Sequence, residues 1–239
     1  DMAEKGRPKI VLIGAAGMSF GPVMVHDAVH CEGIRGANLV LCDINEKPLM
    51  DCFAAAERLN AALDDPIRIT TSTSAAEALD GADFVLTSVE KDRFKYWDQD
   101  YMIPVRYGST QIMGENGGPG GMFHSLRSIK LVLSICREIE RYAPDAYLIN
   151  LTNPMSRVCL AINRGTKLRN VGLCHELFGG HIRIASYLLM PMDRIHVEAS
   201  GINHFTFFYK VENADTGEDL YPRLKAHHKY LSFMYPKLV

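Results

Sequence analysis

Short apolar runs alternate along the chain with longer segments in which apolar residues recur at helical spacing. The runs are rich in valine, isoleucine and leucine, and most of them end at a glycine or a polar side chain, as strands of a buried parallel sheet do. They cover residues 9–13, 38–42, 67–70, 84–87, 147–151 and 170–173. The alternation predicts an α/β protein whose parallel sheet lies between two layers of helices.

Helices are expected between these strands. Residues 22–29 and 47–63 have the length and composition of helices, and Ser74 with Glu77 forms a capping-box pattern that opens another. The segment 129–139 places apolar residues at i, i+3, i+4 and i+7, so it predicts a helix with one buried face.

Residues 88–122 fit neither pattern. They contain the run GENGGPGG at 114–121, which holds too many glycines for a helix or a central strand. A long structured loop within a compact domain is usually functional, so we expect one here.

The first predicted domain ends near residue 200, where a second α+β domain is expected to start. A helix from residue 180 to about 189, an extended run at 195–200 and a helical segment from Tyr221 to Phe233 follow the last strand. We therefore predict one domain over residues 1–200 and the start of a C-terminal domain over residues 201–239. Because no closing element precedes Val239, the sequence is interpreted as the N-terminal half of a larger protein.

Composition argues against two classes of partner. The 26 lysines and arginines nearly balance 28 aspartates and glutamates, giving a net charge of −2 and no basic patch for nucleic acid or a membrane surface. No apolar run reaches the roughly 18 residues of a membrane span, and the polar start lacks a signal core, so a cytoplasmic protein is predicted. The six cysteines show no paired spacing, which favours buried thiols over disulfides.

The first strand leads into a glycine turn, GAAGMSFG, at residues 14–21. Glycines at such a turn let the backbone approach a diphosphate at the helix N-terminus, and Asp43, after the second strand, is placed to accept hydrogen bonds from ribose hydroxyls. The pattern predicts a Rossmann-like, doubly wound sheet that binds NAD, although Ala16 and Ser19 replace glycines of the usual motif. A glycine turn in a nucleotide-free α/β fold is the alternative.

Two further clusters lie at predicted strand ends. A Cys174 thiolate and a His204 imidazole could hold a divalent metal and leave positions open for substrate oxygens, although a strand-end cysteine is more often a core residue. The cluster from Asn150 to Pro154 either caps a turn or presents an amide to substrate or nicotinamide. The residues alone leave both questions open.

Taken together, the sequence resembles the N-terminal half of the family 4 glycoside hydrolases, which are NAD- and manganese-dependent glycosidases. Five glycine-, asparagine- and cysteine-containing landmarks, with Asp43 and Arg127, follow one another in the family's order. The landmarks are KIVLIG (9–14), GGPGG (117–121), NLTNPMS (150–156), GLCHELFG (172–179) and GINHFT (201–206).

The resemblance implies NAD and Mn²⁺ as cofactors and a role for individual residues. Cys174 and His204 would ligate the metal. His175 would be either a candidate acid for the departing oxygen or a residue that supports the metal ligands from behind. The residues at the cofactor would be Gly14, Ala15, Gly17, Met18, Ser19, Phe20, Asp43 and Asn153. Those at the sugar would be Asn153, Glu115, Asn116, Arg127, His175, Glu176 and Asn203.

The implied reaction starts with hydride transfer from C3 of the sugar to NAD, which acidifies the C2 proton. A base removes that proton while the metal stabilises the developing charge, the glycosidic oxygen leaves, water adds and the hydride returns. The family's base is a tyrosine that we expect beyond Val239, since Tyr230 and Tyr235 carry no motif. Ala16 departs from the family's glycine turn and puts the diphosphate contact in doubt. The resemblance implies that residues 1–200 form the NAD-binding domain and that residues 201–239 begin a sugar-binding and dimerisation domain. A homodimer or homotetramer is expected of the full-length protein.

The residues after Cys174, HELFG, resemble the members that act on unphosphorylated α-galacturonides. α-Glucosidase and α-galactosidase activities are alternatives within the family. An NAD-dependent 2-hydroxy-acid dehydrogenase would share the sheet but would need a catalytic histidine and substrate arginines instead of a metal pair. A non-catalytic nucleotide-binding module is the remaining hypothesis.

Overall fold

The computed structural model describes residues 7–18, 20–63, 66–110 and 117–234, with side chains as far as residue 227. The chain divides into two compact units. Unit 1 comprises Asp1–Leu173 and unit 2 comprises Cys174–Val239. The predicted boundary at residue 200, which concerned a sugar-binding domain, stays a prediction.

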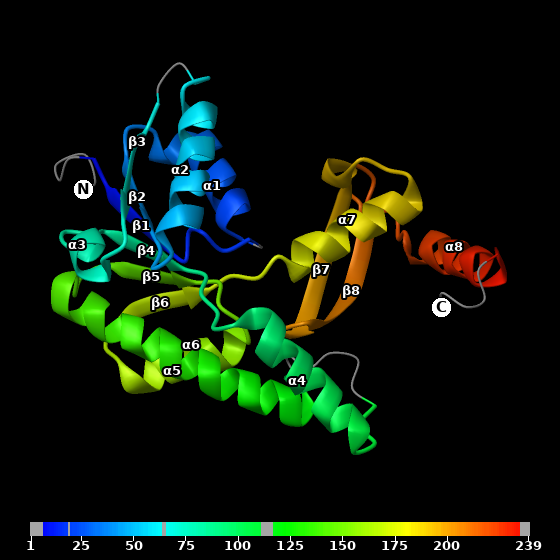
Figure 1. The fold of residues 1–239 in the computed structure, drawn as a ribbon. Helices are drawn as coiled ribbons and strands as arrows, with labels where there is room; N and C mark the ends of the chain where they lie inside the picture. The colour runs from blue at the N-terminus through cyan, green and yellow to red at the C-terminus, as the bar shows by residue number, and fades with distance from the viewer. Residues whose placement is uncertain (1–6, 19, 64–65, 111–116, 235–239) are drawn as a thin grey trace. The chain divides into compact units, whose positions relative to one another are not determined.

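Unit 1 is built on a six-stranded sheet whose strands are all parallel (Figure 1). The strand order is β3-β2-β1-β4-β5-β6, which is the doubly wound order of dinucleotide-binding folds. The strands are β1 (Lys9–Ile13), β2 (Asn38–Cys42), β3 (Arg68–Ser72), β4 (Phe84–Thr87), β5 (Tyr147–Asn150) and β6 (Arg169–Gly172). The predicted fold class is thereby confirmed, with strand bounds within two residues of those expected.

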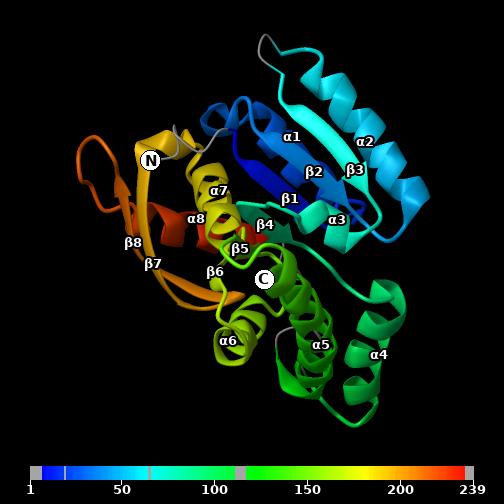
Figure 2. The ribbon, with the colours of Figure 1, turned by 90° about the vertical axis from the view of Figure 1, so that its left-hand side faces the viewer.

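Helices cover both faces of this sheet, because alternate side chains of the buried strands point to opposite sides (Figure 2). Leu12 and Leu41 pack with α1 and α2, whereas Val11 and Val85 pack with the helices of the other face. The first face carries α1 (Gly21–His30) and α2 (Glu46–Asn60), and a short 3₁₀ turn, Glu32–Ile34, follows α1. The second carries α3 (Ala75–Leu79), α5 (Gly118–Tyr142) and α6 (Met155–Gly165).

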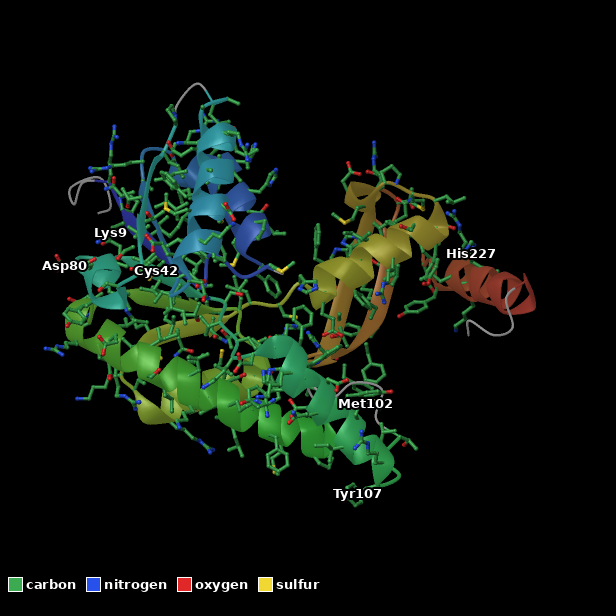
Figure 3. All side chains as sticks on the ribbon, in the orientation of Figure 1. Lys9, Cys42, Asp80, Met102, Tyr107 and His227 are labelled. Atoms are coloured by element: carbon green, nitrogen blue, oxygen red, sulfur yellow. The ribbon has the colours of Figure 1, made fainter. Side chains whose placement is uncertain are left out.

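The expected long loop at residues 88–122 is wrong in two places. A helix, α4 (Arg93–Arg106), lies within it. Only Asp100 and Pro104 of α4 are buried, whereas apolar side chains such as Phe94 and Ile103 are exposed. At its C-terminal end Tyr107 points away from the fold (Figure 3) and is 89% exposed. The glycines after Gly117 begin α5 because Pro119 suits a first turn, whose N–H groups need no helical partner.

Unit 2 consists of a β-hairpin with helices. Its elements are α7 (Glu176–Leu188), the 3₁₀ turn Met192–Arg194, β7 (Ile195–Ile202), β8 (Phe205–Asn213) and α8 (Tyr221–Met234). The two strands pair antiparallel, with an irregularity between Glu198 and Ala199. The helix predicted after Gly180 starts earlier, at Glu176. Gly180 lies within it because a Cβ there would be 2.3 Å from the Phe208 ring, so the glycine lets helix and strand approach.

The cysteines and the lengths of the apolar helices bear on two predictions made from composition. All six cysteines are free thiols, as predicted, but only Cys42 and Cys136 are buried and Cys31 is exposed. Within the described ranges, no helix is long and apolar enough to cross a membrane.

Candidate functional site

The turn after β1 can be built only with glycine at two positions. Gly14 has φ of 88°, and a Cβ there would lie 2.1 Å from the carbonyl oxygen of Ser88 at the end of β4. A Cβ on Gly21 would lie 2.1 Å from the carbonyl oxygen of Ala15. The turn is therefore packed against the neighbouring strand end and against itself, which brings the N-terminus of α1 to the carboxyl edge of the sheet, where such folds bind nucleotides.

Asp43 follows β2 and orders this turn. Its Oδ2 accepts a hydrogen bond from the Ala16 backbone N–H at 3.1 Å, and its Oδ1 accepts from the backbone N–H and Nδ2 of Asn45 at 2.9 and 3.0 Å. A carboxylate offers about four lone-pair sites, so acceptor capacity remains for ribose hydroxyls. The methyl group of Ala16 packs against the core beneath α1, which shows that this departure from the glycine motif is accommodated within the protein.

The other predicted cofactor residues differ in exposure and in the part of the turn that they occupy. The side chain of Ala15 is fully buried and its N–H donates to the carbonyl of Cys42, so any cofactor contact would involve its backbone. Met18 is 87% exposed, Phe20 is the N-cap residue of α1, and Ser19 lies outside the described residues. Burial raises the pKa of the nearby Cys42 thiol to about 11, so this cysteine is a core residue and not a nucleophile.

Of the two asparagines at the end of β5, Asn150 has a structural role and Asn153 is accessible to a ligand. Asn150 is fully buried, accepts from the Thr87 hydroxyl at 3.1 Å and donates to the Thr152 carbonyl at 3.1 Å. The Thr152 hydroxyl in turn accepts from the Val89 N–H at 3.0 Å, which ties the ends of β4 and β5 together. Asn153 is half-buried, and among described residues only its Oδ1 is used, by the Met155 N–H at 3.3 Å. Its Nδ2 is therefore available to a ligand.

A charged cluster between α4 and α5 contains residues that the sequence did not single out. Arg127, a predicted sugar contact, pairs with the buried Asp100 and lies 5.0 Å above the ring of Tyr96. His124 is buried with its Nε2 3.3 Å from Glu90, and desolvation lowers the pKa of His124 although Glu90 opposes that shift. Glu115 and Asn116 lie outside the described residues, so their predicted contacts with sugar stay predictions.

In unit 2 the structure joins two landmarks that are far apart in sequence. The Glu176 carboxylate, in the first turn of α7, accepts a hydrogen bond from the His204 backbone N–H at 2.6 Å. Cys174 is only two residues from Glu176, so their Cα atoms lie at most about 7 Å apart. His175, the N-cap residue of α7, is exposed. The carboxamide of Asn203 is shielded from solvent and has no partner among the described residues.

The predicted metal ligands Cys174 and His204 stay a prediction. Among the described residues, no group of three or more histidine, cysteine, aspartate or glutamate side chains could hold an ion by itself. A thiolate and an imidazole at Cys174 and His204 would leave coordination positions for substrate oxygens, as an open catalytic site requires. Sequence reasoning missed His181 of α7, whose Nε2 is buried without a partner among the described residues.

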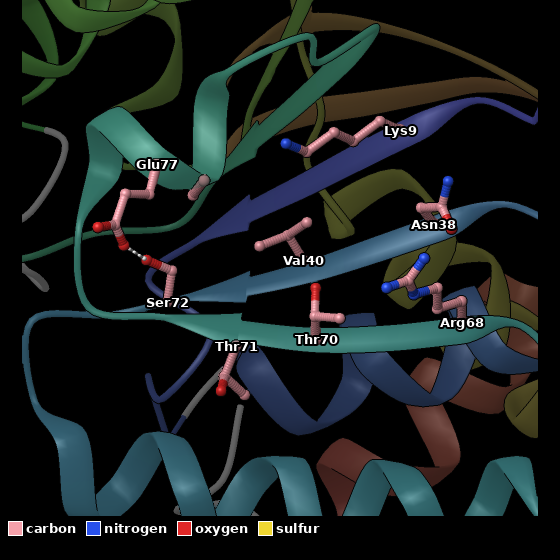
Figure 4. Close-up of a pocket in the computed structure, with 9 residues that line it drawn as sticks. Lys9, Asn38, Val40, Arg68, Thr70, Thr71, Ser72 and Glu77 are labelled. Atoms are coloured by element: carbon pink, nitrogen blue, oxygen red, sulfur yellow. Dashed lines mark hydrogen bonds between the residues drawn. The ribbon is translucent and has the colours of Figure 1, made fainter.

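A groove of about 370 Å³ lies elsewhere on unit 1 (Figure 4). It is lined by Lys9, Asn38 and Arg68, which begin β1, β2 and β3, and by the short helix α3. The Ser72 hydroxyl donates to the Glu77 carboxylate across one end at 3.2 Å. The groove reaches the carboxyl end of β3 at Ser72, but neither Asp43 nor any described residue of the glycine turn lines it.

The strand order, the glycine turn and the acidic residue after β2 together define the Rossmann class of α/β fold. Residues 9–190 match the model of the family 4 glycosyl hydrolases. The chain belongs to this family, which confirms the resemblance drawn from its motifs.

Similar proteins act on several sugars. An α-glucosidase of Erwinia rhapontici is 39% identical over 220 residues, covering 91% of this chain and 49% of the relative. An α-galacturonidase of Lachnoclostridium phytofermentans is 36% identical over 160 residues, covering 64% of this chain and 34% of the relative. The chain thus spans about half the length of the first relative and about a third of the length of the second.

A solved 6-phospho-α-glucosidase from gut microorganisms, in complex with NAD and Mn²⁺, shares the fold. Its TM-score is 0.82 at 23% identity, and the match covers 95% of this chain and 51% of that one. The likeness confirms the predicted architecture.

Proposed function

We propose that the protein is an NAD- and Mn²⁺-dependent glycosidase that acts on unphosphorylated α-glycosides. The observation that carries the proposal is that a chain of this family combines the nucleotide turn of Gly14 and Asp43 with Cys174 and His204, which the Glu176 hydrogen bond links. Neither feature would serve a direct displacement by paired carboxylates.

The two cofactors divide the chemistry between them. NAD would accept and return a hydride, and the divalent ion would stabilise negative charge on neighbouring sugar oxygens. The backbone of residues 14–20 and the carboxylate of Asp43 would hold the dinucleotide, while Cys174 and His204 would hold the metal. The related 6-phospho-α-glucosidase, solved with NAD and Mn²⁺, supports this assignment.

The chain's own polar groups would orient the sugar and move a proton. Asn153 would donate from its Nδ2 to a sugar hydroxyl. The Asn203 carboxamide, buried without a partner among the described residues, carries a desolvation cost that a ligand hydroxyl would relieve. His175 is exposed at the start of α7 and is the candidate acid for the departing oxygen, because an imidazole can donate a proton to a leaving group.

For the substrate we propose an α-galacturonide, because HELFG follows Cys174. Arg127 already forms an ion pair with Asp100, so another cation would be needed to bind the uronate carboxylate. An α-glucoside is the second candidate, favoured by the 39% identity to the Erwinia rhapontici α-glucosidase over 91% of this chain. Parallel assays with aryl α-galacturonide, α-glucoside, α-galactoside and a 6-phosphoglucoside would rank them.

Isotope incorporation tests the reaction itself. In D₂O with Mn²⁺, NAD and the preferred α-glycoside, the released sugar should carry deuterium at C2, because a proton removed there exchanges with solvent. NAD should be required but not consumed. Hydrolysis that proceeds unchanged without NAD would contradict the proposal, and NAD binding without turnover on any of these sugars would favour a non-catalytic module.

The metal assignment has a separate test. Cys174→Ser should abolish Mn²⁺ binding and activity together, because an alcohol stays protonated where a thiol ligand becomes a thiolate. Metal analysis of the purified variant gives the answer, with Cys31→Ser as the control because Cys31 is exposed and lies in unit 1. Unchanged metal content in Cys174→Ser would contradict the assignment. The cytoplasmic location and the homo-oligomeric state stay predictions.

A further inference from the structure

The turn that carries His204 is conformationally demanding. Ile202 pairs with Phe205, so Asn203 and His204 form a two-residue connection between β7 and β8. His204 has φ of 59°, in the left-handed region that non-glycine residues adopt at a cost in free energy. Gly201 has φ of 146°, and a Cβ there would lie 2.3 Å from the carbonyl oxygen of Phe205. Such a turn persists only where other contacts hold it.

Glu176 supplies one such contact. Its Oε2 accepts from the His204 N–H at 2.6 Å, a bond between residues 28 positions apart. Hydrogen bonds to an ionised acceptor are shorter and stronger than neutral ones. The N-terminus of α7 favours a carboxylate at this position because the helix dipole is positive there. The same hydrogen bond fastens the hairpin turn to the segment that begins with Cys174.

We propose that Glu176 is a positioning residue that holds the His204 turn in its left-handed conformation and thereby presents the His204 imidazole beside the Cys174 thiol. This inference rests on the proposed function only in that Cys174 and His204 are taken as metal ligands. It differs from the predicted sugar contact of Glu176, because the carboxylate oxygen is engaged by a backbone N–H of the protein. Asn203 lies in the same turn, so the hydrogen bond would also orient its carboxamide.

Three variants separate this role from the others. Glu176→Ala removes the acceptor, whereas Glu176→Gln keeps a carbonyl oxygen of the same reach without the charge. Glu198→Ala is the matched control, because Glu198 belongs to the same hairpin but accepts from Tyr209 Oη at 3.0 Å and pairs with Lys210, away from the turn.

Two readouts are needed, one of which does not involve metal. Hydrogen–deuterium exchange by mass spectrometry follows the backbone of the peptide containing His204, and electron paramagnetic resonance of free Mn²⁺ gives the metal affinity. We expect Glu176→Ala to speed exchange at the turn and to weaken Mn²⁺ binding by about 10- to 100-fold, the usual effect of losing a partner that orients a ligand. Glu176→Gln should restore both within a few-fold, and Glu198→Ala should change neither.

The outcomes distinguish the possible failures. Unchanged exchange in Glu176→Ala would overturn the inference, as would equal loosening of the turn in Glu198→Ala. Protected exchange in Glu176→Gln combined with Mn²⁺ affinity as poor as in Glu176→Ala would show that the carboxylate itself binds metal, and would also overturn it. If the unsubstituted protein bound no Mn²⁺ while exchange still responded to Glu176, the proposed function would fail and the positioning role would stand.

Discussion

The two units bury their sheets to very different degrees. In unit 1 both faces of the central strands are covered, and Val11, Leu12 and Leu148 are at most 2% exposed. In unit 2 the β7–β8 hairpin packs on one side with α7, while its other side leaves Phe205 and Phe207 61% and 59% exposed. A covered sheet keeps its strand ends, and so the nucleotide turn, in place by its own packing. The hairpin depends on a few specific contacts, of which the Glu176 hydrogen bond is one.

Truncating one apolar side chain in each sheet would test this contrast most strongly. Leu148→Ala in β5 should lower the free energy of unfolding by about 2–5 kcal/mol, because the cavity it leaves in the core cannot fully collapse. Phe207→Ala in β8 should change it by no more than about 0.5 kcal/mol, as for other exposed positions. Urea unfolding measures both. A comparable loss in Phe207→Ala would mean that the outer face of the hairpin is covered in solution, and the contrast would fail.

The nucleotide turn should tolerate no side chain at Gly14. Gly14→Ala combines the left-handed backbone, which costs about 1–3 kcal/mol, with a displaced Ser88 carbonyl, so stability and NAD affinity should both fall. Gly81→Ala is the control, because Gly81 has φ of 68° but a Cβ there would meet no atom within 4 Å. Gly81→Ala should lose only the stability that the left-handed backbone costs. Its NAD affinity, measured by calorimetry, should be unchanged. Full NAD affinity in Gly14→Ala would argue against this turn as the cofactor site.

Neighbouring glycines in α7 should respond with opposite signs. Gly180→Ala would drive a Cβ into the Phe208 ring, and such overpacking costs about 1–3 kcal/mol. Gly179→Ala meets nothing within 4 Å and should stabilise the helix by up to about 1 kcal/mol, because alanine is the better helix former. Thermal unfolding compares the pair. Equal effects would show that α7 and β8 are not packed as closely as described.

The smallest effect concerns cofactor choice in unit 1. Asp43 should favour NAD over NADP, because its carboxylate accepts from a 2′-hydroxyl and repels a 2′-phosphate. Asp43→Asn should reduce that preference about tenfold, which corresponds to about 1.4 kcal/mol. The nearby Lys47 pairs with Asp51 at 3.0 Å, so its charge is already engaged on the surface of α2. NADP binding as tight as NAD binding in the unsubstituted protein would refute the role of Asp43.

The sequence by itself determined the sheet and the local chemistry of its edges. Apolar runs such as Lys9–Ile13 specify buried parallel strands, because side chains on both faces of such a strand are covered by helices. Each buried residue of the run must therefore be apolar, and the pattern can be read from the sequence. The glycine turn and Asp43 could be found for the same reason, since their roles depend on neighbours in a regular unit. The family landmarks pointed to Cys174 and His204 as candidate metal ligands, and that role stays a prediction.

Only the tertiary structure decided the parts that depend on contacts between distant residues. Helix α4 buries Asp100, which pairs with Arg127, and leaves apolar side chains such as Phe94 exposed, so its buried face does not follow hydrophobic periodicity. The glycines of α5 and α7 favour a loop locally, yet close packing such as Gly180 against Phe208 makes them helical. The Glu176 carboxylate reaches a backbone N–H 28 residues away. The donor of this hydrogen bond is a backbone N–H, which every residue except proline has. The residue type at position 204 therefore could not reveal the bond in the sequence.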